Sequence, residues 1–128
     1  MNLLLDTHGL IFFINGDIQL PEKAKNLIKD INNRCYISIA TIWEIAIKIS
    51  LGKLELNGGF DNIPNIIDKY EFELLPISIA HIAEIIGLEF YHRDPFDRII
   101  IAQGIIEKIP IITKDRNFEF YRIETIWE

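Results

Sequence analysis

Acidic residues of this chain stand where short apolar segments end. Asp6 comes directly after residues 3–5, which are all leucine, and Asp115 follows soon after the apolar residues 111–112. An unbroken apolar run of this length is typical of a strand buried on both faces of a parallel sheet. Such sheets bind their ligands at the carboxyl ends of the strands. We therefore expect Asp6 and Asp115 to be neighbours at one edge of a sheet.

Two further segments bring carboxylates to the same edge. Glu44 lies in the first turn of a helix expected over residues 42–51, which leaves the second strand at its carboxyl end. The helix expected over residues 95–108 leads into the fourth strand, so its own start, with Asp94 and Asp97, lies at that edge as well. Four segments converge, and the carboxylates expected at this edge are those of Asp6, Glu44, Asp94, Asp97 and Asp115.

Carboxylates crowded at one sheet edge repel each other and raise their own pKa values unless a cation balances them. Oxygen ligands without a His and Cys cluster favour a hard cation, Mg²⁺ or Mn²⁺, over zinc. Such a cation can polarise a phosphoryl oxygen and lower the pKa of a bound water, so hydrolysis of a phosphodiester is the expected chemistry. Four basic residues flank the acids and are expected to contact substrate phosphates: Arg93, Arg98, Lys114 and Arg116.

Strands and helices alternate along the chain and position these acids. Besides residues 3–5, strands are expected over residues 36–39, 72–77, 109–113 and 124–127, and helices over residues 21–31, 42–51, 78–88 and 95–108. A capping box of Thr41 and Glu44 is expected to open the second helix, which stops at Gly52, and Asp94 to cap the helix that begins at Pro95. The alternation predicts a single α/β domain over residues 1–128, with a central, mostly parallel sheet of four to five strands and helices on both faces.

Composition limits the class of protein. With 49% hydrophobic and 25% charged residues among 128, the chain has the balance of a globular domain. Its net charge of −6 excludes a global positive field that gathers nucleic acid, so any such contact must be local. No apolar run approaches the ~20 residues that cross a bilayer, and no secretory signal is recognisable, so a cytoplasmic location without membrane contact is expected. The single cysteine, Cys35, is expected in a buried strand and fits a reducing compartment.

Four segments resemble the PIN-domain ribonucleases and, more narrowly, the VapC-type toxins of type II toxin-antitoxin systems: LLLDTH, TIWEIAIK, RDPFDRIIIAQ and IITKD. They occur in the family's order and span nearly the whole chain. The resemblance implies a PIN-like fold and a Mg²⁺- or Mn²⁺-dependent endoribonuclease in which a metal-activated water hydrolyses RNA. It implies a metal-binding quartet of Asp6, Glu44, Asp97 and Asp115, with Asp94, Thr7 and Thr113 as accessory residues. It also implies a cognate antitoxin that blocks the acidic pocket, and a homodimer. At position 8 much of the family has a small polar residue or Asn, whereas this chain has His8.

Most of these acids also have a purely structural explanation. Glu44 completes its capping box, Asp94 caps a helix, Asp97 suits a helix dipole, and Asp115 can start a turn. Asp6 is harder to explain in this way, because a carboxylate at the end of a buried strand needs a partner or a cation to offset its desolvation. The convergence of all four favours the functional interpretation.

Histidines and aromatic residues give weaker signals. His81 is expected on a helix surface, and His92 in a loop with at most a contact to substrate, because neither has metal-ligand spacing. The aromatic residues have the spacing of core or interface residues rather than of a base-stacking platform: Phe12, Phe13, Trp43 and Phe96.

Two other classes of function compete with a ribonuclease. A receiver-like phosphotransfer domain needs an acceptor Asp after the third strand, where this chain has Pro76, Ile77 and Ser78. A haloacid-dehalogenase-type phosphatase needs a second Asp two residues after the first, and that position is His8. A catalytically silent PIN-like binding scaffold would be favoured by the loss of an acid, and none is missing.

Overall fold

A single parallel sheet forms the centre of the computed structural model, which describes all 128 residues. Its strands are β1 (Asn2–Leu5), β2 (Arg34–Ser38), β3 (Glu73–Leu75), β4 (Ile111–Ile112) and β5 (Thr125–Ile126). They lie in the order β3-β2-β1-β4-β5, and every neighbouring pair is parallel. The predicted α/β class is confirmed, with a sheet that is entirely rather than mostly parallel.

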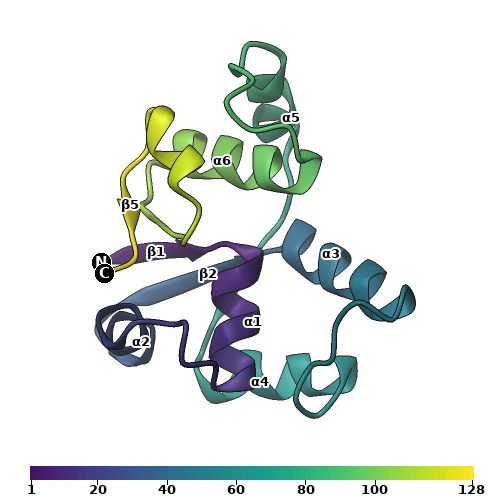
Figure 1. The fold of residues 1–128 in the computed structure, drawn as a ribbon. Helices are drawn as coiled ribbons and strands as arrows, with labels where there is room; N and C mark the ends of the chain where they lie inside the picture. Colours follow the sequence, from purple (N-terminus) through teal and green to yellow (C-terminus); the bar gives the residue numbers. More distant parts are fainter.

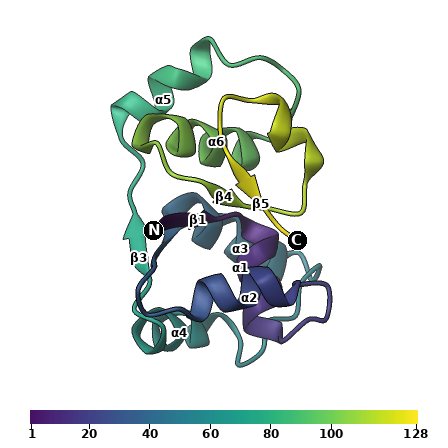
Figure 2. The ribbon, with the colours of Figure 1, turned by 90° about the vertical axis from the view of Figure 1, so that its left-hand side faces the viewer.

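Helices cover both faces of the sheet. They are α1 (Thr7–Asn15), α2 (Glu22–Lys29), α3 (Ile39–Ser50), α4 (Ile63–Lys69), α5 (Ile79–Ile86) and α6 (Pro95–Glu107), with short 3-10 helices η1 (Phe60–Asn62) and η2 (Arg116–Phe120). In both views α5 and α6 lie on one side of the sheet, and α1, α2 and α4 on the other (Figures 1 and 2). None of these helices is long and apolar enough to cross a membrane.

The unbroken apolar run of β1 divides between two cores. Leu3 and Leu5 belong to the core under α1 and α2, while Leu4 points to the opposite face and belongs to the core under α6. All three leucines are 0% exposed. Because successive side chains of a strand point to opposite faces, a strand buried on both sides must be apolar at every position.

Sequence periodicity did not predict α1 and α4. In α1 five consecutive apolar residues, from Leu10 to Ile14, hide any helical period. The limits of α1 are fixed by its capping residues. At the start of the helix the Asp6 side chain accepts the Gly9 N–H, and after the end of the helix Gly16 adopts the left-handed conformation. Helix α4 has only seven residues.

The predicted start of α3 was wrong. The helix begins at Ile39, directly after β2, and the Ser38 hydroxyl caps it by accepting the Ala40 N–H at 3.1 Å. Thr41 therefore lies inside the helix, and its hydroxyl oxygen is 3.2 Å from that of Thr7. The predicted capping box of Thr41 and Glu44 does not form. Ser38 both ends β2 and caps α3, so no residues separate the strand from the helix and Thr41 cannot be the cap.

His81 is buried, with 2% exposure, and not on a helix surface as predicted. Its Nδ1 accepts the Ser78 N–H at 3.0 Å, and its Nε2 lies 2.8 Å from a Glu107 carboxylate oxygen. The imidazole thus completes the N-terminal capping box of α5 in the place where Glu or Gln usually stands. Burial of the imidazole is tolerated because both of its ring nitrogens have hydrogen-bond partners.

We predict that Ser38→Ala lowers the free energy of unfolding by about 1 kcal/mol, because it removes the capping oxygen of α3. Ser38→Gly is the matched control and should cost less, since glycine is itself a tolerated N-cap residue. Urea unfolding followed by circular dichroism measures both. Equal stability of Ser38→Ala and the wild type would mean that the helix does not start at this residue.

Candidate active site

The structure brings the four predicted acids together at the carboxyl edge of the sheet. Asp6 follows β1, Asp115 follows β4, Glu44 comes from α3 and Asp97 from the first turn of α6. Repulsion acts between Asp97 and both Asp6 and Glu44, and between Asp6 and Asp115. We refer to these four residues as the acidic cluster.

Asp6 is held by hydrogen bonds to both of its carboxylate oxygens. Gly9 N–H donates to Oδ1 at 2.8 Å, and the Thr113 hydroxyl donates to Oδ2 at 2.7 Å. The side chain is almost completely buried, and this burial raises the pKa of Asp6 above its ordinary value, although both hydrogen bonds and the charge of His8 act in the opposite direction. The residue that ends the first strand therefore also begins the first helix, in a fixed orientation.

Glu44 is fixed in a comparable way. The Thr7 hydroxyl donates to its Oε1 at 2.7 Å, and Lys48 Nζ lies 3.2 Å from its Oε2. Thr7, like Thr113, thus orients a carboxylate of the acidic cluster. Sequence reasoning gave Lys48 no part in the site, although its position four residues after Glu44 on one helix is the signal for such a pair.

Asp97 carries the clearest electrostatic signature of the site. Burial, followed by the charges of Asp94, Asp6 and Glu44, raises the pKa of Asp97 to about 7, although the charge of His92 lowers it. A carboxyl group of this kind costs free energy when it ionises. The acidic cluster is therefore short of positive charge at neutral pH.

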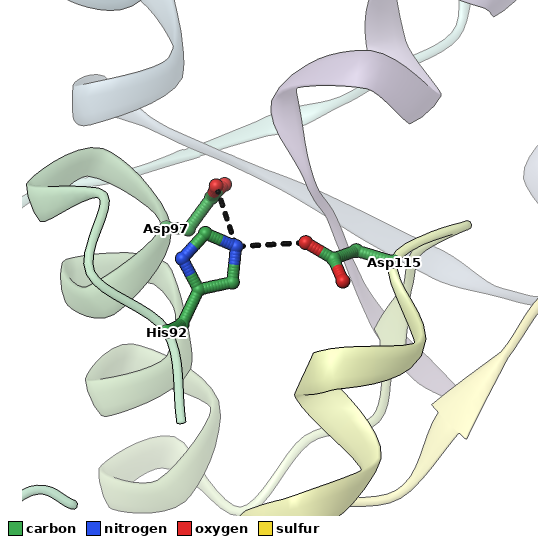
Figure 3. Close-up of side chains that lie close together, drawn as sticks. All are labelled: His92, Asp97 and Asp115. Atoms are coloured by element: carbon green, nitrogen blue, oxygen red, sulfur yellow. Dashed lines mark hydrogen bonds and ion pairs between the residues drawn. The ribbon is translucent and has the colours of Figure 1, made fainter. Parts of the chain in front are cut away.

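His92 lies between two of the acids (Figure 3). Its Nε2 is 2.7 Å from Oδ2 of Asp115 and 3.1 Å from Oδ2 of Asp97. Its Nδ1 accepts the Asp94 N–H at 3.2 Å, so Nε2 carries the proton and donates to the carboxylates. Sequence reasoning placed His92 in a loop with at most a substrate contact, and missed this position.

The donor set fits a divalent cation. Carboxylate oxygens of Asp97 and Asp115 and a nitrogen of His92 lie within 4.8 Å of one another. Because the Nδ1 of this imidazole accepts the Asp94 N–H, His92 could offer a cation only its Nε2, and only without the proton on that atom. The oxygens of the acidic cluster are then the ligands available, and a hard cation is the one they prefer.

The structural explanations of two acids hold beside this arrangement. Oδ1 of Asp94 caps α6, accepting the Phe96 N–H at 2.8 Å and the Asp97 N–H at 3.4 Å. Oδ1 of Asp115 accepts the Asn117 N–H at 2.9 Å and starts η2, while its other oxygen faces His92. A single carboxylate can thus end an element and face the site.

The structure contradicts the expectation that Arg98 contacts phosphate. Arg98 is 5% exposed, and its guanidinium donates to four backbone carbonyls, one in the last turn of α5 and three in the segment that leads from α5 to α6: Ile85, Leu88, Glu89 and His92. Position 98 of α6 faces this segment and not the sheet edge. Arg98 therefore holds in place the loop that carries His92.

Of the other basic residues, Lys114 and Arg116 lie beside the acidic cluster. Both are exposed, and both line an open cavity of about 520 Å³ that also contacts Asp6 and Asp115. The remaining lining residues are His8, Phe12 and Gln19. We call this space the Lys114 cavity. Arg93 is exposed and comes directly before Asp94, the N-cap of α6.

Comparison with known proteins places this chain in a family. The PIN domain family matches residues 3–124. The chain therefore belongs to the PIN domain family. Its parallel α/β sheet, with acidic residues at the carboxyl edge, agrees with this class of protein. No curated protein matches it by sequence.

Solved structures give full-length matches to VapC toxins of VapBC complexes. VapBC2 from Rickettsia felis, bound to a promoter DNA fragment, matches with a TM-score of 0.74 and 18% identity over 100% of both chains. DNA-bound VapBC from Salmonella typhimurium matches with a TM-score of 0.73 and 19% identity over 98% of this chain and 97% of the other. VapBC-5 from Mycobacterium tuberculosis, a member of the VapBC family of toxin-antitoxin systems, matches with a TM-score of 0.63 and 19% identity over 99% and 98%. At such identities the likeness shows the fold.

We predict that Asp97→Asn stabilises the metal-free protein more at pH 8 than at pH 5. The folded-state pKa of Asp97, about 7, is above its ordinary value of 3.8, so the wild type loses stability as the pH rises through this range. The increase in the free energy of unfolding that Asp97→Asn causes should be about 2 kcal/mol larger at pH 8 than at pH 5. Urea unfolding in EDTA measures it, with the exposed acid variant Asp61→Asn as control. A gain that is independent of pH would contradict the raised pKa.

We also predict that Arg98→Met lowers the free energy of unfolding by about 3 kcal/mol, because it leaves several buried carbonyls without a donor. Arg93→Met, the same change at an exposed arginine, should stay within about 0.5 kcal/mol of the wild type. Both are measured without RNA or metal. Wild-type stability of Arg98→Met would restore Arg98 as a candidate for contact with substrate.

Proposed function

We propose that this protein is a Mg²⁺- or Mn²⁺-dependent endoribonuclease that acts as the toxin of a type II toxin-antitoxin system. The observation that carries the proposal is the acidic cluster: four carboxylates from four segments meet at one edge, and one of them, Asp97, has its pKa raised to about 7. Membership of the PIN domain family, a nuclease family, supports the same reaction. RNA is the proposed substrate.

Asp6, Glu44, Asp97 and Asp115 would hold the cation. When bound, it would supply a polarised phosphoryl oxygen and an activated water at neutral pH. Thr113 and Thr7 fix Asp6 and Glu44 in orientation, so that the ligand oxygens need not reorganise. Lys114 and Arg116 offer positive charge to the phosphates next to the one that is cleaved, which overcomes locally the net charge of −6. Arg93 is the third residue proposed to contact phosphate.

His92 has a separate part in this proposal. Without a cation, its Nε2–H donates to Asp97 and Asp115 and satisfies an oxygen of each. This is a weaker substitute for the positive charge that the cluster lacks, because a single imidazole cannot balance several carboxylates. Asp94 is proposed to act mainly as the cap of α6 and only as an accessory of the site.

The proposed partner is a cognate antitoxin. The similar structures include VapBC-5, a member of a toxin-antitoxin family, and a toxin-antitoxin complex from Klebsiella pneumoniae. We propose that the antitoxin of this chain covers the acidic cluster, where a basic side chain would find the charge deficit described above. A homodimer and a cytoplasmic location belong to the same proposal.

Neither alternative class of function gains an observation in its favour. The PIN domain match leaves the receiver-like and dehalogenase-like interpretations without support. A silent binding scaffold of the same fold differs from the proposed nuclease only in activity, so a direct assay of cleavage separates the two.

We predict that Asp6→Asn reduces metal-dependent RNA cleavage by a factor of about 100 or more, because it removes a ligand charge at nearly constant volume. Growth inhibition on expression should disappear with it. Cleavage of labelled RNA in Mg²⁺ and in Mn²⁺ measures the rate, and circular dichroism verifies the fold.

Asp94→Ser is the matched control, since it keeps a capping oxygen at the start of α6 and should retain much of the activity. Addition of Mn²⁺ should raise the melting temperature of the wild type and of Asp94→Ser more than that of Asp6→Asn. Cleavage by folded Asp6→Asn at the wild-type rate would refute the proposed function. Equal loss in both variants would place Asp94 among the ligands.

A further inference from the structure

The Lys114 cavity continues from the acidic cluster along the exposed side of α1. Asp6 and Asp115 form one part of its lining, while Lys114, Arg116 and His8 bring nitrogen donors and Phe12 brings an aromatic ring. Its volume of about 520 Å³ falls within the ~300 to 1,000 Å³ of sites that bind small molecules. Carboxylates and cations thus line one space that opens to solvent.

Lys114 is held in place inside this cavity. Its Nζ donates to Oε1 of Gln19 at 2.7 Å, which joins the loop after β4 to the loop after α1. The same Nζ lies 6.0 Å from the centre of the Phe12 ring. The ammonium group that bonds to Gln19 thus lies over an aromatic ring that lines the same cavity.

Phe12 and His8 present two rings one helical turn apart on α1, with centroids 6.0 Å from each other. Phe12 is half-buried, and Trp127 supports it from another side at a centroid distance of 6.3 Å. The sequence pattern indicated a core residue at position 12. The ring does pack on the core, and its remaining part faces the cavity, beside ammonium and guanidinium groups that can bind phosphate.

We infer that the Lys114 cavity binds the nucleotide next to the scissile phosphate, with the base against Phe12 and a phosphate at Lys114 and Arg116. A flat apolar ring and fixed cations are the two components of single-stranded nucleic acid sites. The His8 imidazole, which lines the same cavity, can bond to a base edge, whereas the Gln19 amide oxygen already accepts from Lys114. The identification of the phosphate as the scissile one rests on the proposed function, whereas the binding of a nucleotide does not.

The test compares Phe12→Leu with Phe13→Leu, each made in the Asp6→Asn protein. Phe13 is the neighbouring, half-buried phenylalanine of the same helix, but it packs on Tyr70 and Phe72 at centroid distances of 4.7 and 5.9 Å and does not line the cavity. Fluorescence anisotropy with a labelled single-stranded RNA oligonucleotide in Mg²⁺ gives the dissociation constant, and a gel verifies that the RNA stays intact. Phe12→Leu should raise this constant about tenfold, as expected for the loss of one base stack, and Phe13→Leu should leave it unchanged.

A second measurement uses the same substitutions in the protein with Asp6 restored. Phe12→Leu should raise KM and alter the base preference beside the cut, while Phe13→Leu should change neither. Equal dissociation constants for the two variants would overturn the inference, even if the wild type cleaves RNA. Conversely, a wild type that cuts no RNA in Mg²⁺ or Mn²⁺ would remove the proposed function, while the loss of RNA binding on Phe12→Leu alone would still establish the nucleotide site.

Discussion

Repulsion between carboxylates that meet at one sheet edge, two of them buried and two partly exposed, is the constraint on which the rest of this structure depends. Each of these groups loses hydration, and each faces others of the same charge. For Asp97 the two effects together raise the pKa to about 7. A fold selected for stability alone would not gather acids in this way, so their neighbours have to orient and partly satisfy them.

Those neighbours come from every segment that reaches the edge. Hydroxyl groups of Thr7 and Thr113 each donate to one carboxylate, and His92 donates to two. Helix starts contribute as well, because Asp6 caps α1 and Asp97 lies in the first turn of α6, where free N–H groups favour negative charge. Arg98 supports the arrangement indirectly, by binding the carbonyls of the loop that carries His92. These contacts fix positions and leave the deficit of positive charge in place, which is the condition for binding a cation.

Although the protein is acidic overall, two basic side chains lie directly beside the acidic cluster. Lys114 and Arg116 stand on the loop that follows β4, within a few residues of Thr113 and Asp115. The same short loop thus supplies a hydroxyl donor, a carboxylate and two cations to one cavity. An assignment of function from the net charge of −6 would have missed this arrangement, since the field close to a phosphate is set by its nearest groups.

The sequence by itself determined the fold class and the edge at which the acids meet. Uninterrupted leucines before Asp6 require a strand buried on both faces, and alternation with helices requires parallel strands, whose carboxyl ends share one edge. The cap at Asp94 was predictable too, because its partners lie within three residues. Such features depend on local periodicity and on the short-range reach of a side chain.

Only the tertiary structure decided which polar side chains face the cluster. Arg98 and His92 are six residues apart, yet the arginine turns into the loop while the imidazole enters the site, in each case because of carbonyls and carboxylates that the fold brings from other segments. Buried His81 was misassigned for the same reason, since Glu107 is distant in sequence. Phe12 packs on the core as predicted, but its second contact, with the cavity that Lys114 lines, could not be predicted because Lys114 is also distant in sequence. Spacing along a chain gives the face of a helix or strand, but the partners across that face are set by packing.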